Sequence, residues 1–161
     1  MAVFKEIYQE YGQPVYRFLL SLTGEEEFSQ ELLQETFYQA FLHIDQFEGR
    51  SSVFTWLCQI GKNAWLKECR RRKRFEEKEL EQIEITDRIL TPEEVAVQKD
   101  TCFRIRKAVY HLEEPYQNVF ILRVFGEQKF QDIGKIYGKT ESWARVTFFR
   151  AKAKILEEVE P

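Results

Sequence analysis

Cysteine, histidine, glycine and proline are all scarce in this chain of 161 residues, which holds three, two, seven and four of them. The cysteines stand alone at Cys58, Cys69 and Cys102, with neither the even count of a disulfide framework nor the paired spacing of zinc ligands. We therefore expect reduced thiols and a cytoplasmic protein. No apolar run approaches the ~18 residues of a membrane span, and the charged, amphipathic N-terminus does not resemble a signal peptide.

Motifs of enzyme chemistry are also absent from the sequence. It contains no glycine-rich phosphate loop, no set of His, Cys and Asp residues suited to catalysis, and no cluster of metal ligands. Asp132 and Glu141 are interpreted as solvated or helix-capping residues. We predict that the chain is not an enzyme and that it has no catalytic residue, no metal site and no cofactor.

What the chain does contain is an abundance of helix formers, with apolar residues at helical spacing. Hydrophobic residues make up 43% of the sequence, which is ordinary for a folded protein. We predict an all-α fold with two helical domains, residues 1–75 and 92–161, joined by an acidic linker at residues 76–91. The predicted helices are residues 4–22, 25–44, a third starting at Ser51 or Ser52, 92–111, 115–125, 129–137 and 140–157.

The charge is distributed unevenly along the chain, although the formal net charge is only -3. Residues 62–74 carry seven Lys or Arg and one Glu, and residues 135–154 carry six Lys or Arg and one Glu. Between them, residues 76–94 carry eight Asp or Glu against two basic residues. Two basic segments therefore flank an acidic one, a pattern that the net charge conceals.

The helix that leads into the first basic segment has sides of different chemistry. The side expected to be buried carries Val53, Leu57, Ile60 and Ala64. Trp56, Asn63 and Arg70 fall together on another side. An aromatic ring stacks on an unpaired base, an amide hydrogen-bonds a base edge, and cations neutralise phosphates, so this side suits a separated DNA strand. The open alternative is that Trp56 packs in the core and that residues 70–74 are a solvated helix end.

The second basic segment, FQDIGKIYGKTESWARVTFFRAKAKIL (residues 130–156), has the layout of a helix-turn-helix. Its longer helix is expected to bury Ala144, Phe148, Ala151 and Ile155. Ser142, Val146, Phe149 and Arg150 should then point outward. Exposed apolar groups suit thymine methyls in a major groove, with arginines reaching bases or phosphates. The alternative is a plain helical hairpin in which Phe149 packs on a neighbour.

These two domains, in this order, resemble a bacterial extracytoplasmic-function (ECF, group 4) sigma factor of the sigma-70 family. ELLQETFYQAF (residues 31–41) is similar to the region 2 segment that docks on the clamp helices of RNA polymerase. FEGRSSVFTWLCQIGKN (residues 47–63) is similar to the segment that captures and melts the -10 element. LEEPYQNVF and the helix-turn-helix after it resemble region 4, which binds the -35 element.

The resemblance implies a region 2 bundle of three or four helices and a region 4 helix-turn-helix, with a role for each matching residue. Contacts with the single-stranded -10 element would come from Phe47, Arg50, Ser51, Ser52, Phe54, Trp56, Lys62, Asn63, Arg70, Arg71 and Arg72. Contacts with duplex -35 DNA would come from Lys139, Thr140, Ser142, Trp143, Arg145, Val146, Phe149, Arg150 and Lys152. Contacts with core polymerase would come from Glu31, Gln34 and Glu35.

The resemblance also implies partners and a role for the linker. The partners are core RNA polymerase, through its clamp helices and flap, promoter DNA, and an anti-sigma factor of the kind that is often membrane-anchored. The acidic linker would thread polymerase channels as a polyanion mimic; a solvated spacer is the alternative. Trp143, Val146 and Thr147 depart from the residues commoner in the family, so the -35 preference of other members does not transfer.

Two other functions fit an all-helical chain with a helix-turn-helix. One is a two-domain transcriptional regulator that does not act as a sigma subunit, and the other is a helical protein-binding adaptor. The N-terminal domain discriminates between the sigma factor and the regulator, because a sensor has no need of Phe54, Trp56, Asn63 and residues 70–74 together. We therefore predict a sigma factor that selects promoters and starts DNA melting.

Overall fold

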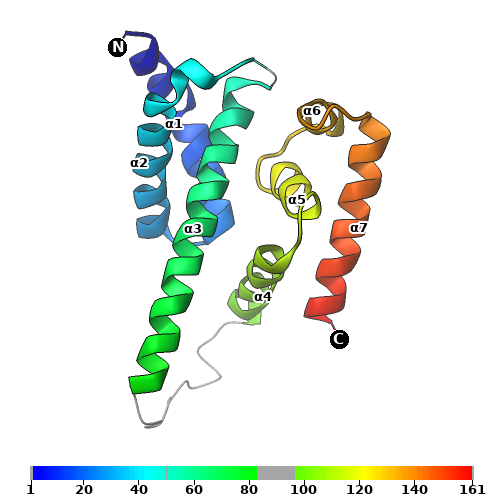
Figure 1. Ribbon diagram of the computed structural model, residues 1–161. Helices are drawn as coiled ribbons and strands as arrows, with labels where there is room; N and C mark the ends of the chain where they lie inside the picture. The colour runs from blue at the N-terminus through cyan, green and yellow to red at the C-terminus, as the bar shows by residue number, and fades with distance from the viewer. Residues whose placement is uncertain (1, 50, 83–96, 161) are drawn as a thin grey trace.

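The computed structural model describes residues 2–49, 51–82 and 97–160, and all regular secondary structure in these ranges is helical (Figure 1). The first lobe contains α1 (Ala2–Thr23), α2 (Glu26–Leu42), a 3-10 turn η1 (Ile44–Gln46) and α3 (Val53–Gln82). The second lobe contains α4 (Val97–His111), α5 (Tyr116–Val124), α6 (Phe130–Ile136) and α7 (Glu141–Val159). The predicted all-α fold is confirmed. Within the described ranges, no helix has the length and apolar character needed to cross a membrane.

The helix bounds agree with the predicted ones to within a few residues, except at the linker. Helix α3 continues to Gln82, so the first seven residues of the predicted linker are helical. Their Glu, Lys, Leu and Gln side chains have high helix propensity, which accounts for the extension. Arg50, the rest of the predicted linker and the start of the predicted helix at 92 lie outside the described residues.

Helix α3 packs closely against α1 and α2 at Gly61. A Cβ atom there would lie 3.1 Å from Leu19 Cδ2 and 3.2 Å from Thr36 Oγ1, so no larger residue fits without displacement. This close approach turns the inner side of α3 relative to the predicted one. The residues of this side are Leu57, Cys58, Gly61 and Trp65, all buried. Of the predicted inner set only Leu57 is buried, and Val53, Ile60 and Ala64 are half-buried.

The second lobe is a helix-turn-helix packed on α4 and α5, and the predicted orientation of α7 is confirmed. Ala144, Ala151 and Ile155 are buried, and Phe148, also predicted to be buried, is half-buried and packs on the core. Val146 and Phe149 are 47% and 54% exposed. The N-terminus of α7 is capped by Thr140, whose Oγ1 accepts a hydrogen bond from the Trp143 N–H at 3.0 Å.

The turn between α6 and α7 depends on two glycines. Gly138 has a φ of +64°, a conformation that glycine adopts without a Cβ penalty. Gly134 lies close to the backbone that leads into α7. A Cβ atom at Gly134 would lie 2.7 Å from the Thr140 carbonyl oxygen and 2.8 Å from the Lys139 carbonyl oxygen. The backbone of residues 139 and 140 therefore lies too close to α6 for position 134 to carry a side chain.

We predict opposite effects of the same substitution at two helical glycines. Gly134→Ala should lower the free energy of unfolding by about 1–3 kcal/mol, because the added methyl overpacks against backbone. Gly12→Ala, in α1 with nothing within 4 Å of the new Cβ, should raise it by about 0.5–1 kcal/mol through helix propensity. Urea denaturation measures both values. A stabilising Gly134→Ala would show that the turn is looser than described.

Candidate nucleic-acid interface

An aromatic hollow lies where the loop before α3 meets the helix. The Phe47 and Trp56 rings have centroids 5.1 Å apart, and both line a hollow of about 210 Å³. Ile136 of the second lobe closes one side of it. Trp56 is half-buried, so it is neither a full core residue nor a freely solvated one. The remaining lining residues are Gln46, Glu48, Ser51 and Gln59.

The three other residues predicted in this loop and first turn have different positions. Ser52 is the helix cap, since its Oγ accepts from the Thr55 N–H at 3.1 Å and donates to Thr55 Oγ1 at 2.9 Å. Ser51 borders the hollow. Phe54 is half-buried and packs on the core of the lobe. The hydroxyl of Ser52 and the ring of Phe54 thus support the hollow, and Ser51 with Trp56 lines it.

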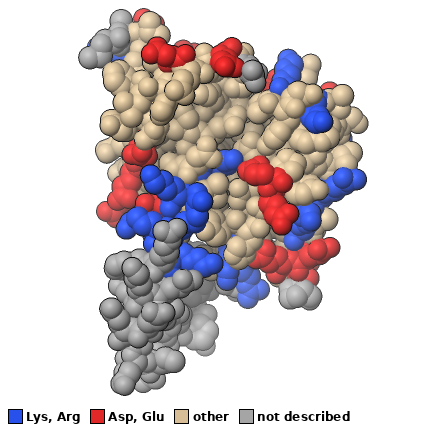
Figure 2. Space-filling view, in the orientation of Figure 1, with Lys and Arg blue, Asp and Glu red and all other residues tan. Residues whose placement is uncertain are grey.

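A larger groove of about 760 Å³ runs between α2 and α3. Glu31 and Glu35 lie on its α2 side, and Asn63, Lys67 and Arg71 lie on its α3 side. Glu35 also accepts a hydrogen bond from Gln39 Nε2 at 2.9 Å, and Gln34 is exposed outside the groove. Figure 2 shows red carboxylates and blue basic side chains adjoining in the region where α2 meets α3 in Figure 1. The groove therefore brings two predicted polymerase contacts beside the exposed amide of Asn63.

The arginines of α3 have different partners. Arg70 is exposed and donates from Nε to the Leu66 carbonyl at 3.3 Å. Arg71 pairs with Glu68, with Nη2 2.6 Å from Oε1, and this hydrogen bond is the main cause that holds the pKa of Glu68 below its usual value. Arg72 turns toward α2, where it meets carboxylates and an aromatic ring.

Lys62 occupies a position that local sequence patterns do not indicate. It is 7% exposed, and its Nζ lies 3.2 Å from Glu114 Oε1, in the connection between α4 and α5. Thr55 Oγ1, two turns earlier on nearly the same side, donates to Gln128 Oε1 at 2.8 Å. The second lobe therefore covers this side of α3. Lys62 and Glu114 are 52 positions apart, so their contact leaves no periodic pattern in the sequence and could not be predicted from helical spacing.

A further contact joins the lobes at the corner between α1 and α2. Arg106 Nη2 of α4 donates to the Ser21 carbonyl at 3.2 Å, and the Arg106 guanidinium lies directly on Gly24. A Cβ atom at Gly24 would be 2.6 Å from Arg106 Nη1. Sequence analysis missed Arg106 because a single arginine on an amphipathic helix carries no signal of its partner.

The outer face of α7 presents the other predicted set. Ser142, Arg145 and Arg150 are exposed beside Val146 and Phe149, and Arg145 Nη2 pairs with Glu141 Oε1 at 3.0 Å. Lys139, Thr140 and Lys152 are also exposed. Trp143 differs from the rest, because it is half-buried with its ring centroid 5.0 Å from that of Tyr137. The Trp143 ring therefore packs on Tyr137 at the turn and remains partly exposed to solvent.

The three thiols differ in reactivity. Burial raises the pKa of Cys58 far above its usual value, and burial, as the largest cause, raises the pKa of Cys69 to about 11. Both thiols are therefore protonated and unreactive near neutral pH. Cys102 is exposed on α4.

Comparison with known proteins supports the same assignment of the chain. The family model for sigma-70 region 2 matches residues 7–75, the segment that contains the hollow and the groove. The chain is 28% identical over 156 residues to the ECF RNA polymerase sigma factor SigM of Bacillus subtilis, covering 93% of this chain and 91% of that protein. It is 28% identical over 153 residues to the RNA polymerase sigma factor YlaC of the same organism, covering 94% and 88%.

Solved structures agree in fold. The sigma factor RpoE from Bartonella quintana, in complex with the anti-sigma factor NepR, aligns with a TM-score of 0.59 at 22% identity, over 99% of this chain and 98% of that one. CnrH, in complex with the cytosolic domain of CnrY, aligns with a TM-score of 0.53 at 16% identity, over 98% and 89%. Residues 7–75 therefore contain a sigma-70 region 2 domain, and over more than nine-tenths of its length the chain is similar to RNA polymerase sigma factors of the ECF type.

Proposed function

We propose that the first lobe of this sigma factor holds the -10 element as a separated strand along one side of α3. The observation that supports this is the order of groups on that side: the Phe47–Trp56 hollow, then Asn63, then Arg70. Trp56 and Asn63 are two turns apart, about 10 Å along the helix axis. A base stacked in the hollow, a second base on the amide and a phosphate at Arg70 would use each group in turn.

The second lobe is proposed to bind the -35 element as duplex DNA. The outer face of α7 combines exposed apolar side chains at Val146 and Phe149 with the guanidinium groups of Arg145 and Arg150. A helix in the major groove can place apolar groups on thymine methyls and arginines on guanine edges or phosphates. Lys139, Thr140 and Lys152 would bind the flanking backbone.

Core polymerase is the proposed partner of the α2 face, through Glu31, Gln34 and Glu35. Catalysis of RNA synthesis belongs to the polymerase, and this chain supplies promoter selection and strand separation. We also propose the domain limits 1–75 and 92–161, with the acidic segment 76–91 passing through polymerase channels. RpoE and CnrH were solved with protein partners, and we propose an anti-sigma factor for this chain as well.

Use of both DNA-binding faces requires the lobes to part. In the structure the second lobe lies on the side of α3 that contains Thr55 and Lys62, and Ile136 borders the hollow. Lys62 can reach a phosphate only after it leaves Glu114. Polymerase binding to each lobe separately would supply the free energy for this separation.

The Lys62–Glu114 ion pair between the lobes should respond unequally to removal of its two charges. Glu114→Gln should lower the free energy of unfolding by about 1 kcal/mol, because it leaves the ammonium of Lys62 buried without a carboxylate. Lys62→Met should cost less, since Glu114 is half exposed and can be solvated. The measurement is urea denaturation of the two single variants and the double variant. Equal and additive losses would mean that the pair does not interact.

Run-off transcription with core polymerase tests the proposed function. The wild-type chain should produce a specific start without another sigma factor, whereas a regulator would produce none. Trp56→Ala with Asn63→Ala should leave core binding intact and reduce open-complex formation, because a base loses its stack and an amide partner. Permanganate footprinting measures this as lower thymine reactivity in the bubble.

Phe103→Ala provides the matched control, because Phe103 is an exposed aromatic on α4 away from the hollow. It should leave thymine reactivity at the wild-type level. Wild-type reactivity in the Trp56 and Asn63 double variant would remove these residues from strand separation.

A further inference from the structure

Three consecutive arginines on α3 look equivalent in the sequence but have different surroundings. Arg70 makes no ion pair with any residue in the described ranges, and its guanidinium is exposed. Arg71 pairs within its own helix, with Glu68. Arg72 crosses to α2. The run therefore divides into one open cation, one cation paired locally and one cation that joins two helices.

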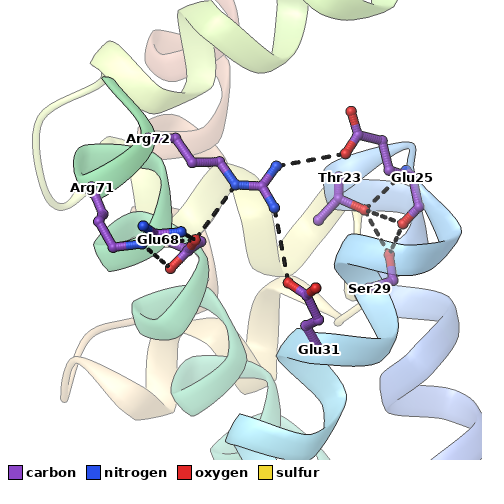
Figure 3. A network of polar contacts seen from close by, with 7 residues as sticks. All are labelled: Thr23, Glu25, Ser29, Glu31, Glu68, Arg71 and Arg72. Carbon is purple, nitrogen blue, oxygen red and sulfur yellow. Dashed lines mark hydrogen bonds and ion pairs between the residues drawn. The ribbon is translucent and has the colours of Figure 1, made fainter. Parts of the chain in front are cut away.

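Arg72 is surrounded by carboxylates. Its Nη1 lies 3.7 Å from Glu25 Oε2, its Nη2 lies 3.9 Å from Glu31 Oε2, and its Nε lies 3.5 Å from Glu68 Oε1 (Figure 3). The guanidinium carbon also lies 3.7 Å from the centroid of the Phe28 ring, which is otherwise part of the core. A planar guanidinium can stack on a ring while its edges face several carboxylates, and an ammonium cannot do both.

The segment that Arg72 contacts, at the start of α2, is held by hydrogen bonds of its own. Thr23 Oγ1 and Ser29 Oγ are 2.6 Å apart, and the Glu25 N–H donates to Thr23 Oγ1 at 3.1 Å. Ser29 Oγ lies 2.7 Å from the Glu25 carbonyl, to which it donates. These bonds set the start of α2, where the carboxylates of Glu25 and Glu31 both face Arg72 (Figure 3).

We propose that Arg72 is a positioning residue that holds the first turns of α2, and with them Glu31, against α3, and that it is not a phosphate contact. The proposal rests on the proposed function, in which Glu31 meets core polymerase and Arg70 meets DNA. A phosphate that bound Arg72 would lie beside the carboxylates of Glu25, Glu31 and Glu68, which repel it. Arg70 has no ion pair with a carboxylate of the described residues. Arg72 thus acts on polymerase docking through Glu31.

Arg72→Gln and Arg70→Gln form a matched pair, two residues apart with the same new side chain. Two quantities are measured with the full chain: affinity for core polymerase, and the salt dependence of holoenzyme binding to a promoter fork with a single-stranded -10 element. Arg72→Gln should weaken core affinity about 3- to 10-fold and leave the slope of log K against log salt unchanged. Arg70→Gln should leave core affinity unchanged and reduce the slope by about 0.7, the value for one phosphate on a single strand.

Two further variants test the route of the effect. Arg72→Lys keeps the charge but not the planar geometry, and should weaken core affinity as Arg72→Gln does. Glu25→Gln should also weaken core affinity, and the loss should not add to that of Arg72→Gln, because both remove the same contact. Glu25 is the N-cap residue of α2 and its variant should not affect folding through α3, so it reports even if Arg72→Gln is unstable.

The proposal is overturned if Arg72→Gln reduces the salt slope and spares core affinity, or if Arg72→Lys restores wild-type affinity. Additive losses in the double variant would also contradict it. Failure of the proposed function has a different signature: Arg70→Gln and Trp56→Ala would then both leave fork binding at wild-type strength and slope, whatever Arg72→Gln does.

Discussion

The close packing of α3 on α1 and α2 at Gly61 is the constraint on which the rest of the first lobe depends. A helix presents its side chains at fixed angles, so fixing Leu57, Gly61 and Trp65 inward fixes every other side of α3. Trp56, Asn63 and Arg70 then share one outward side, while Thr55 and Lys62 share another that meets the second lobe. One helix in this way contributes to the core, to the proposed site for the DNA strand and to the contact between lobes.

The contact between lobes combines polar pairs with an aromatic contact. The polar pairs are the Lys62–Glu114 ion pair, the Thr55–Gln128 hydrogen bond and the Arg106 hydrogen bond to a carbonyl. Beside them, the Trp65 ring of α3 meets the Tyr110 ring of α4 edge to face, with centroids 6.2 Å apart. The polar pairs lose much of their Coulombic gain to desolvation, so they specify how the lobes meet more than they stabilise the meeting. Water or new partners can satisfy the same groups after separation.

The all-helical fold, most helix limits and the outer face of α7 could be predicted from the sequence, because they follow from local periodicity and capping. The inner side of α3 could not, since the absence of a side chain at Gly61 decides which side approaches α1. Likewise Arg70, Arg71 and Arg72 are indistinguishable along the chain, and only the tertiary position of Glu25 and Phe28 separates Arg72 from its neighbours. The burial of Lys62 depends on a carboxylate 52 positions away. Local patterns therefore predict the helices and their outward sides, and long-range packing decides which residues of each side are free and which are paired.

The central claim is that the side of α3 bearing Lys62 changes from contact with the second lobe to contact with DNA. Energy transfer between a dye on the exposed Cys102 of α4 and one at an introduced Gln9→Cys on α1 measures the distance between lobes directly. Cys58 should stay unlabelled because it is buried, and Cys69 because it is half-buried with its pKa raised to about 11. The account predicts a short distance in the free chain that lengthens when core polymerase is added. An unchanged distance in a holoenzyme that transcribes from its promoter would contradict it.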